Sequence, residues 1–311
     1  MTVIKQFSDY TFTRREELQE IIEVNYLKVP INDIVSKVVE GLYKLKNAEI
    51  DEYDYNLSHS ISTSEKISIE LNEEHFKSIS QVKQAVSLSQ VQLLIYLLHL
   101  FHQGNAQTDL LLEAKDYFKH RAIKLTKASK DRLERDLLLL SSITIEVEVK
   151  KGKRKDFCYS RLLDFKKVKR GYYEVSFGTW ISHLSNKSYT LVHKKLLQYH
   201  PSRDWISILL SLKLAQLAKL QFPKNYSTSA LKFSTIFNLL DIDHRKISKQ
   251  GIQYYSKILS EAFNQLQQDE QYRLHFNLTN VTYTELMNAK LEYTQPLLIE
   301  NYRKKPKGKA M

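Results

Sequence analysis

Residues 126–160 read TKASKDRLERDLLLLSSITIEVEVKKGKRKDFCYS, and within this stretch the hydrophobic period changes from that of a helix to that of a strand. Leucines at helical spacing predict a helix over 126–140. Residues 143–149 then alternate strictly between apolar and polar, which is typical of a strand with one buried face. A basic run at 150–155 leads to a predicted return strand over 156–160. The stretch therefore predicts a helix followed by a hairpin with a basic tip.

Two further helices are predicted upstream of this stretch. Ser89 caps the apolar run 89–101, which ends at the helix-stop signal Gly104-Asn105. A second helix is predicted over 110–120, followed by a turn at 121–125. The predicted order is three helices, a strand, a basic loop and a second strand, which is the order of a winged helix-turn-helix. In that fold the third helix enters the major groove and the hairpin, called the wing, contacts adjacent backbone.

The same order partly repeats downstream and predicts a second module of the same kind. The predicted elements are a strand over 172–177, helices over 191–197, 205–220 and 229–240, a turn at 241–245, a long helix over 248–267 and a strand over 273–282. The helix over 205–220 is expected to be amphipathic, and Pro223 ends it.

The chain before residue 86 differs in character. Residues 14–46 have helical spacing interrupted at Pro30. Residues 47–70 are polar, acidic and rich in serine, which is typical of an exposed connection or short strands. The predicted fold class is mostly α with short β-hairpins (α+β), with two tandem winged helix-turn-helix modules after an N-terminal helical extension. The predicted domains are an acidic extension over 1–85, a first module over 86–168, a second module over 169–290 and a basic tail over 291–311.

Charge is distributed unevenly along the chain, whose formal net charge is +12. Residues 1–85 carry 10 basic and 15 acidic residues, whereas residues 86–311 carry 37 and 20. Residues 115–170 alone hold 18 basic and 8 acidic residues. A concentrated cationic field attracts a phosphate backbone through counterion release. Because the cations coincide with the predicted modules, we expect double-stranded DNA as the partner.

Composition argues against several other classes of protein. The chain has one cysteine, Cys158, so it offers neither an internal disulfide nor a cysteine cluster for zinc. Its longest apolar stretch, 91–101, is too short to span a membrane, and no signal peptide is recognisable. A cytoplasmic protein with no membrane partner, no metal and no cofactor is therefore expected.

Candidate DNA contacts lie on the exposed sides of the two predicted third helices and on the wing. Cations contact phosphates or guanine edges, and glutamine contacts adenine. In the second module the predicted contacts are Lys246, Lys249, Gln250, Gln253, Tyr254 and Lys257. In the first module they are Lys127, Lys130, Arg132 and Arg135, with the wing residues Lys150, Lys151, Lys153, Arg154 and Lys155. The alternative interpretation of these stripes is an ordinary solvated helix face.

A catalytic site is not recognisable in the sequence. His99-Leu-Phe-His102 has the wrong gap for the metal site of a rolling-circle nickase, and it lies on a buried helix. His193, Tyr199, His200 and Arg203 are near one another in sequence, but the ordered arginine and tyrosine set of a tyrosine recombinase is not recognisable. No Gly-x-x-x-x-Gly-Lys loop and no carboxylate cluster for two-metal chemistry occur. We therefore expect a protein without catalytic activity.

The tandem units resemble plasmid replication initiator proteins of the double winged-helix kind over about residues 86–285. The resemblance lies in the seam RLLDFKKVKRGYYEVSF at 161–177, in Ser188-Tyr189 and in the long leucine helix that follows. It implies binding to repeated sites at a plasmid or phage replication origin, help in melting or bending the DNA, recruitment of host replication proteins and, in some members, promoter repression as a homodimer.

Three alternatives to replication initiation remain open from the sequence. A transcriptional regulator on the same fold would bind an operator instead of a repeat array. A DNA nickase or recombinase would leave a covalent tyrosine adduct or a metal-dependent nick. A protein-interaction surface on the C-terminal helices would give no salt-sensitive retention on DNA.

Overall fold

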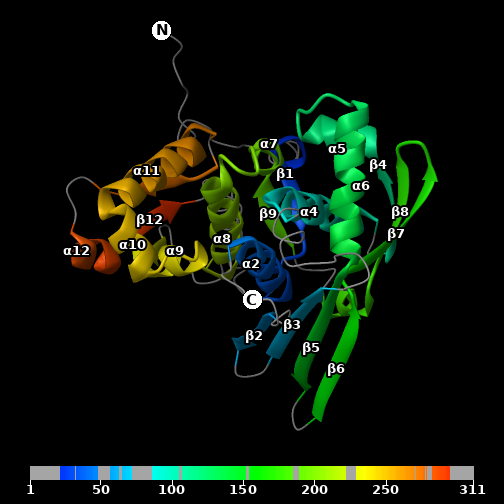
Figure 1. The fold of residues 1–311 in the computed structure, drawn as a ribbon, viewed down its shortest axis with the longest axis horizontal. Helices are drawn as coiled ribbons and strands as arrows, with labels where there is room; N and C mark the ends of the chain where they lie inside the picture. Colours follow the sequence, from blue (N-terminus) through cyan, green and yellow to red (C-terminus); the bar gives the residue numbers. More distant parts are fainter. Residues whose placement is uncertain are drawn as a thin grey trace, which may run out of the picture. The chain divides into compact units, whose positions relative to one another are not determined.

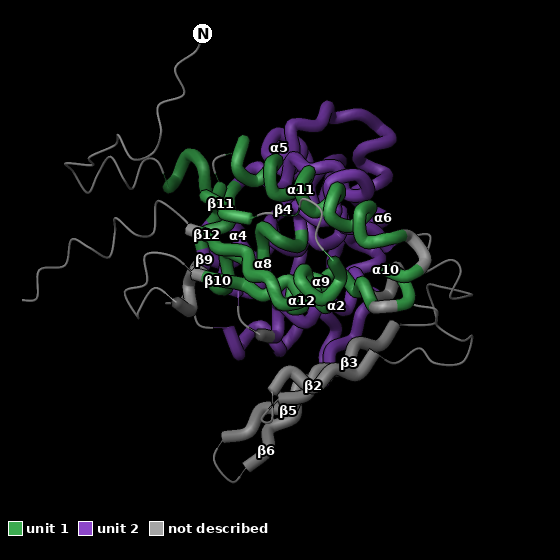
Figure 2. Tube along the Cα trace, turned by 90° about the vertical axis from the view of Figure 1, so that its left-hand side faces the viewer, with its two compact units in different colours: residues 1–27, 191–193, 209–311 green, residues 28–190, 194–208 purple. Residues whose placement is uncertain are grey.

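The computed structural model describes residues 22–31, 33–47, 57–62, 65–71, 86–104, 107–151, 154–184, 189–221, 229–269, 271–276, 278 and 282–294. The chain divides into two compact units, which Figure 2 colours separately. The larger unit comprises residues 28–190 and 194–208, and the smaller comprises 1–27, 191–193 and 209–311. Both contain helices and small antiparallel sheets, so the α+β class is confirmed.

The larger unit holds most of the strands (Figure 1). Its elements are α2 (Asp33–Asn47), β2 (Leu57–Ser62), β3 (Glu65–Leu71), α4 (Leu88–Gln103), β4 (Asp109–Glu113), α5 (Ala114–His120), α6 (Lys127–Ser141), β5 (Ile143–Lys151), β6 (Arg154–Arg161), β7 (Leu163–Lys169), β8 (Tyr172–Phe177), the 3-10 helix η2 (Thr179–His183) and α7 (Lys195–Gln198). Three elements have residues in both units: β1 (Tyr26–Val29), β9 (Thr190–His193) and α8 (Trp205–Gln221).

The first module runs from α4 to β8, a strand predicted to belong to the second module, and is built on an antiparallel sheet in the order β4-β8-β7. The inner face of this sheet is apolar, and α6 adds Leu133 and Leu137, each at most 1% exposed. Burial of a leucine of this kind stabilises the fold by about 1.5–3 kcal/mol. The sheet and α6 therefore share one core, and Figure 1 shows the β7–β8 hairpin beside α6.

Strand β4 corrects the helix predicted over 110–120, of which only the second half, α5, is helical. Leu110 and Leu112 are buried and Leu111 is 62% exposed, so the burial alternates as in a strand. The sequence did not reveal this because three consecutive leucines fit a helical period as well as a strand.

The hairpin predicted over 143–160 is confirmed as β5–β6, with register from Thr144↔Arg161 to Lys151↔Arg154. Its predicted role as the wing of the first module is wrong, because it belongs to a separate sheet in the order β2-β3-β5-β6. The hairpin that joins β4 is β7–β8. Strand β3 pairs with β5 along its whole length. Strands β2 and β3, in the segment expected to form an exposed connection or short strands, thus belong to the same sheet.

The second module, from α8 to β12, repeats this arrangement. After α8 its elements are β10 (Ser229–Lys232), α9 (Phe233–Leu239), α10 (His244–Gln250), α11 (Ile252–Gln268), β11 (Arg273–His275), α12 (Tyr283–Asn288) and β12 (Lys290–Thr294). Its antiparallel sheet has the order β10-β12-β11, so in both modules the last strand lies between the other two.

Several predicted elements of this region need correction. The predicted helices over 191–197 and 229–240 begin as the strands β9 and β10. The predicted helix over 248–267 is two helices, α10 and α11, because Gly251 between them has φ 83 and ψ 149. That backbone conformation is open essentially to glycine alone. The helix over 205–220 is confirmed as α8, but residues 206–212 are all buried, so that stretch is not amphipathic.

The two modules share one turn geometry between their second and third helices. In the first module Ala122 has φ 51, and Ile123 N donates to Phe118 O at 2.9 Å. In the second Asp241 has φ 51, and Ile242 N donates to Phe237 O, also at 2.9 Å. This 6→1 bond closes a helix C-terminus with one left-handed residue.

The start of the second helix is held in the same way in both modules. Ala114 N donates to Gly171 O at 2.9 Å, and Phe233 N donates to Ala289 O at 3.1 Å. In each case the acceptor directly precedes the central strand of the sheet. The two modules are therefore a structural repeat, which the sequence showed only as a partial recurrence of elements.

Candidate nucleic-acid interface

A groove of about 530 Å³ lies between α6 and the β7–β8 hairpin. Five cations from the two elements line it: Lys127, Lys130, Lys167, Lys169 and Arg170. The remaining lining residues are Asp131, Glu134, Val168, Gly171 and Tyr173. Five cations against two carboxylates make this groove a candidate site for a polyanion.

The N-terminus of α6 places two of these lysines at the mouth of the groove. Thr126 caps the helix: Ser129 N donates to Thr126 Oγ1 at 3.1 Å, and Thr126 N donates to Ser129 Oγ at 2.8 Å. The helix therefore begins at Lys127, and its first turn carries no acidic residue. Lys127 and Lys130 add to the partial positive charge of the helix end, which favours anions.

The hairpin supplies the other three cations through a tight turn and a bulge. Gly171 has φ 83, a left-handed conformation that lets the chain reverse between β7 and β8. The register shifts between Lys167 and Lys169, so Val168 has no partner in the ladder and is 54% exposed. The Lys169 ammonium lies 4.2 Å from the centre of the Tyr172 ring, which fixes its direction.

Glu134 ties the hairpin to the helix. Its Oε1 accepts from Lys167 Nζ at 2.6 Å and from Tyr173 Oη at 2.8 Å. These two bonds lower the pKa of Glu134, whereas burial, together with the bond to Glu134, raises the pKa of Tyr173. The charge of Lys167 is consequently offset inside the groove, and the other four cations carry most of its positive field.

The two predicted arginines of α6 lie outside this groove. Arg132 and Arg135 are exposed on the side of the helix away from its core residues, while Lys127 and Lys130 line the groove. All four predicted residues of α6 are therefore at or near the surface, but only the lysines are brought together with the hairpin.

A buried carboxylate holds α6 against α4. Asp136 is 4% exposed and accepts from Ser89 Oγ at 3.0 Å and from Gln90 Nε2 at 2.5 Å. Burial raises the pKa of Asp136 to about 6, although the two bonds and nearby arginines oppose that shift. The orientation of α6, and hence of its lysines, depends on this contact.

Arg121 lies within the basic stretch 115–170, but its side chain belongs to the core and not to the positive surface. It is 3% exposed, and its Nη2 donates to Gln92 Oε1 at 2.7 Å. Gln92 Nε2 in turn donates to Leu196 O at 2.8 Å and to Tyr199 O at 2.9 Å. The network satisfies the carbonyls of α7 and fixes the segment that leads into α8.

In the second module the predicted contact residues fall on two helices instead of one. Lys246, on α10, is held inside the turn, because its Nζ donates to Asp241 O at 2.6 Å and to Asp241 Oδ2 at 2.8 Å. Gln253, Tyr254 and Lys257 are exposed on α11. The single stripe predicted across both helices is wrong, since the break at Gly251 changes the helical phase between them.

Some predicted contacts cannot be compared with the structure. Lys153 lies outside the described residues, as do the side chains of Lys150, Lys151, Arg154, Lys155, Lys249 and Gln250. The six residues other than Lys153 have their backbones in β5, β6 and α10. The hairpin cations that the groove contains, Lys167, Lys169 and Arg170, were not among the predicted contacts, although the seam at 161–177 contains them.

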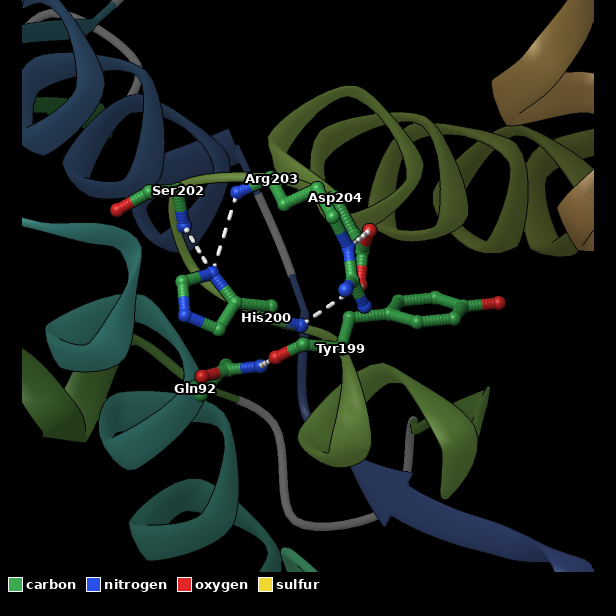
Figure 3. Close-up of polar contacts among 6 residues, drawn as sticks. All are labelled: Gln92, Tyr199, His200, Ser202, Arg203 and Asp204. Carbon is green, nitrogen blue, oxygen red and sulfur yellow. Dashed lines mark hydrogen bonds and ion pairs between the residues drawn. The ribbon is translucent and has the colours of Figure 1, made fainter.

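The residues near His200 form the start of α8, as Figure 3 shows. His200 Nδ1 accepts from Ser202 N at 3.3 Å and from Arg203 N at 3.2 Å. His200 N donates to Asp204 Oδ2 at 2.9 Å, and Arg203 Nε donates to Asp204 Oδ1 at 2.8 Å. The imidazole and the guanidinium are therefore engaged in a local turn that begins the helix.

The other histidines singled out from the sequence also have structural contacts. His99 is 7% exposed with Nδ1 3.2 Å from Lys28 O, and burial lowers its pKa to about 4. The His193 ring lies edge-on to Tyr26, with centroids 5.0 Å apart. Among the described residues no group of three His, Cys, Asp or Glu is placed to hold a metal ion. None of the described helices is long and apolar enough to cross a membrane.

Comparison with known proteins gives similarity of structure only. No protein-family model and no curated protein sequence matches the chain. The crystal structure of selenomethionine derivatives of domains 2 and 3 of RctB is similar over 82% of this chain and 98% of that chain, with TM-score 0.47 and 11% identity. A second crystal structure of RctB domains 2–3 covers 81% of this chain and 95% of that chain, with TM-score 0.42 and 9% identity.

Proposed function

We propose that this protein binds double-stranded DNA through two winged-helix modules, with α6 and α11 as the helices that enter the major groove. The topology supports this: the turn after the second helix has the same geometry in both modules, and the last strand of each sheet lies in the middle. In the first module the wing is β7–β8. A winged helix places its third helix in the major groove and its wing on the neighbouring backbone.

The groove between α6 and β7–β8 is the observation that carries the proposal. Its cations come from both the helix start and the hairpin turn, so a phosphate strand lying between the two elements is contacted from both sides. Each neutralised phosphate releases counterions, and such contacts set position on the duplex without reading sequence. The first module is therefore proposed to grip the backbone.

Base reading is assigned to the second module. Gln253 and Lys257 are one turn apart and exposed on α11, next to exposed Tyr254. Glutamine pairs with adenine edges and lysine with guanine edges in the major groove. Loss of either side chain is expected to weaken specific binding by about 1–3 kcal/mol, with a much smaller effect on random DNA.

The proposal is tested by the affinity of groove variants for duplex DNA. The double variants Lys127→Ala/Lys130→Ala and Lys169→Ala/Arg170→Ala should each lower affinity roughly tenfold or more for specific and random duplexes alike. Lys115 and Lys119, exposed on α5 outside the groove, give the matched control Lys115→Ala/Lys119→Ala. Equal losses in the control and in both groove variants would show that total charge, and not the groove, binds DNA.

We further propose that the bound DNA is a set of repeats at a plasmid or phage origin, and that the protein starts replication there without catalytic activity of its own. The support is the resemblance carried by residues 161–177, of which Lys167, Lys169 and Arg170 line the groove. Host replication proteins and a homodimeric repressor state belong to the same proposal.

The gene with its flanking DNA should maintain a plasmid that lacks any other origin, and the groove variants should abolish maintenance. Protection of a single operator with no plasmid maintenance would favour a transcriptional regulator instead. Nicking of supercoiled DNA by the purified chain would establish a nickase or recombinase.

A further inference from the structure

The outer faces of the two sheets carry opposite charge. In the first module the side of β4-β8-β7 away from the core, here the acidic face, carries four carboxylates, of which Glu113 is half-buried, and two lysines. These are Asp109, Glu113, Asp164, Glu174, Lys166 and Lys169, of which Lys169 lies beside the hairpin turn and also lines the groove. In the second module the corresponding side of β10-β12-β11, here the basic face, exposes three permanent cations, one histidine and one carboxylate. These are Lys232, Arg273, Lys290, His275 and Glu292.

One corresponding position in the repeat has opposite charge in the two modules. Glu113 and Lys232 each end the first strand of their sheet, directly before Ala114 and Phe233, whose amides make the matching bonds to the residue before the central strand. In the middle of the same strands, Leu111 is 62% exposed on the acidic face, and the smaller Ala230 is exposed on the basic face. A projecting apolar side chain on one face thus has a small residue at the corresponding place on the other.

The basic face also holds a repulsive pair. Lys232 and Lys290 are directly opposite each other on antiparallel strands, and both are exposed. Like charges at directly opposed positions destabilise a sheet. An acidic partner surface would remove this repulsion. The corresponding pair on the acidic face is Glu113 and Tyr172, whose hydroxyl donates to Glu113 Oε1 at 3.1 Å.

From this complementarity we infer that the acidic face of one copy of the chain binds the basic face of a second copy, head to tail. Such an interface uses two different surfaces of the same chain, so it does not close into a pair but continues into an array. The acidic face repels a polyanion, which leaves a cationic protein surface as its partner, and the basic face of another copy supplies one.

The interface should be weak in free solution. The strands involved are three to seven residues long, so the contact is smaller than a standard stable interface. Copies bound next to one another on DNA would have a much higher effective concentration. The role in assembling copies along adjacent sites rests on the proposed DNA-binding function, whereas the association itself does not.

Sedimentation velocity of the full chain without DNA, over a concentration series at low salt, tests the association. The acidic-face variant Asp109→Lys/Glu113→Lys and the basic-face variant Lys232→Glu/Lys290→Glu should each self-associate about tenfold more weakly or less. The second variant keeps a like-charged cross-strand pair, so its folding stability is matched to the parent. Reversal of two exposed lysines on α5, Lys115→Glu/Lys119→Glu, should leave association within about twofold of the parent, because that pair is on neither face.

Mixing the two face variants gives the decisive result. In the acidic-face variant both faces are cationic, and in the basic-face variant both faces are acidic. Each face of one variant can therefore bind a face of the other variant, and the mixture should associate as the parent does. Far-UV circular dichroism and thermal melting of each variant confirm that it is folded.

A parent chain that stays monomeric at every concentration, or a mixture that does not recover, would overturn the inference. A third result is that only a chain carrying both reversals regains the sedimentation behaviour of the parent, and does so at every concentration. That result would mean that the two faces pair within one chain. In a separate DNA-retention assay, loss of binding by the basic-face variant with unchanged self-association would assign that face to DNA. Because the sedimentation test contains no DNA, its failure leaves the proposed function standing.

Discussion

In the first module the residue after α5 is Arg121, whereas the residue after α9 at the same place in the turn is Leu240. Both are buried, at 3% and 1% exposure. The repeat therefore puts a charged side chain and an apolar one into equivalent positions of the same turn. The turn itself needs only the left-handed residue that follows, so its backbone accommodates either arginine or leucine at the preceding position.

The polar contacts in the two cores differ accordingly. The first module buries Arg121 and Asp136, each with several hydrogen bonds. In the second, Ser211 Oγ donates to Gln271 Oε1 at 2.8 Å, and Tyr272 Oη donates to Ser211 O at 3.2 Å, all of them neutral groups. Ionised groups are costly to bury unless their partners are complete. The first module should thus be the more sensitive of the two to single substitutions and to pH.

Importing the residue of the second module into the first should have the largest effect. Arg121→Leu would leave Gln92 Oε1 without its buried donor and the Leu197 carbonyl with only the longer bond from Gln92 Nε2, at a cost of about 3 kcal/mol in the free energy of unfolding. Urea denaturation measures it. Arg132→Leu, an exposed arginine on α6, is the control and should change stability by less than about 0.5 kcal/mol. Similar losses of unfolding free energy in both variants would show that the Arg121 hydrogen-bond network does not contribute to stability beyond what an exposed arginine does.

The buried carboxylate should make stability depend on pH. The folded-state pKa of Asp136, about 6, lies above its ordinary value of 3.8, so the folded state binds the proton more tightly than the unfolded state. This contribution to stability is complete below pH 3.8 and is lost as the pH rises through 6.

Asp136→Asn removes that contribution, so stability should fall less between pH 4 and pH 7 in the variant than in the parent, by on the order of 2 kcal/mol. Urea denaturation at several pH values gives the difference. A constant difference between parent and variant over this range would mean that Asp136 is already ionised in the folded state at low pH.

The break between α10 and α11 is a backbone effect that the continuous helix α6 lacks. A Cβ at Gly251 would meet no atom within 4 Å, so Gly251→Ala costs only the strain of φ 83. We expect a loss of about 1–2 kcal/mol in unfolding free energy, measured by thermal or urea denaturation. A more stable variant with higher helicity would indicate that α10 and α11 join into one helix at no cost.

The smallest effect is expected at Glu134. Glu134→Gln removes a carboxylate from the groove and releases Lys167 from its ion pair. Affinity for random duplex DNA should rise roughly twofold to fivefold. The slope of log affinity against log salt should steepen by about one, as for one additional phosphate contact. An affinity that falls instead would show that Glu134 acts mainly by holding the hairpin in place, since its bonds to Lys167 and Tyr173 would then matter more than its charge.

The long periodic elements could be predicted from the sequence, and the short ones could not. The helices α4, α6 and α8 and the hairpin β5–β6 follow from patterns within one segment. Strands β4 and β10 are short and run directly into helices, and their strand identity comes from pairing with β8 and β12, far away in the sequence. The wing was misassigned for the same reason, because hairpin pairing is local but membership of a sheet is not.

The groove itself was predicted only in part. Lys127 and Lys130 follow from the helix that Thr126 caps, and a cap is a local signal. Lys167, Lys169 and Arg170 become partners of that helix only through the β4-β8-β7 sheet, which the sequence pattern did not reveal. The burial of Arg121 could not be predicted, because nothing in its own segment shows that Gln92 would accept its hydrogen bond.

The dependence of duplex DNA binding on salt tests the central claim most directly. If the groove holds phosphates, the slope of log affinity against log salt should be smaller by about two in Lys169→Ala/Arg170→Ala than in the parent. The slope should be almost unchanged in Lys115→Ala/Lys119→Ala. Equal slopes for the parent and the groove variant would contradict the assignment of this groove to DNA.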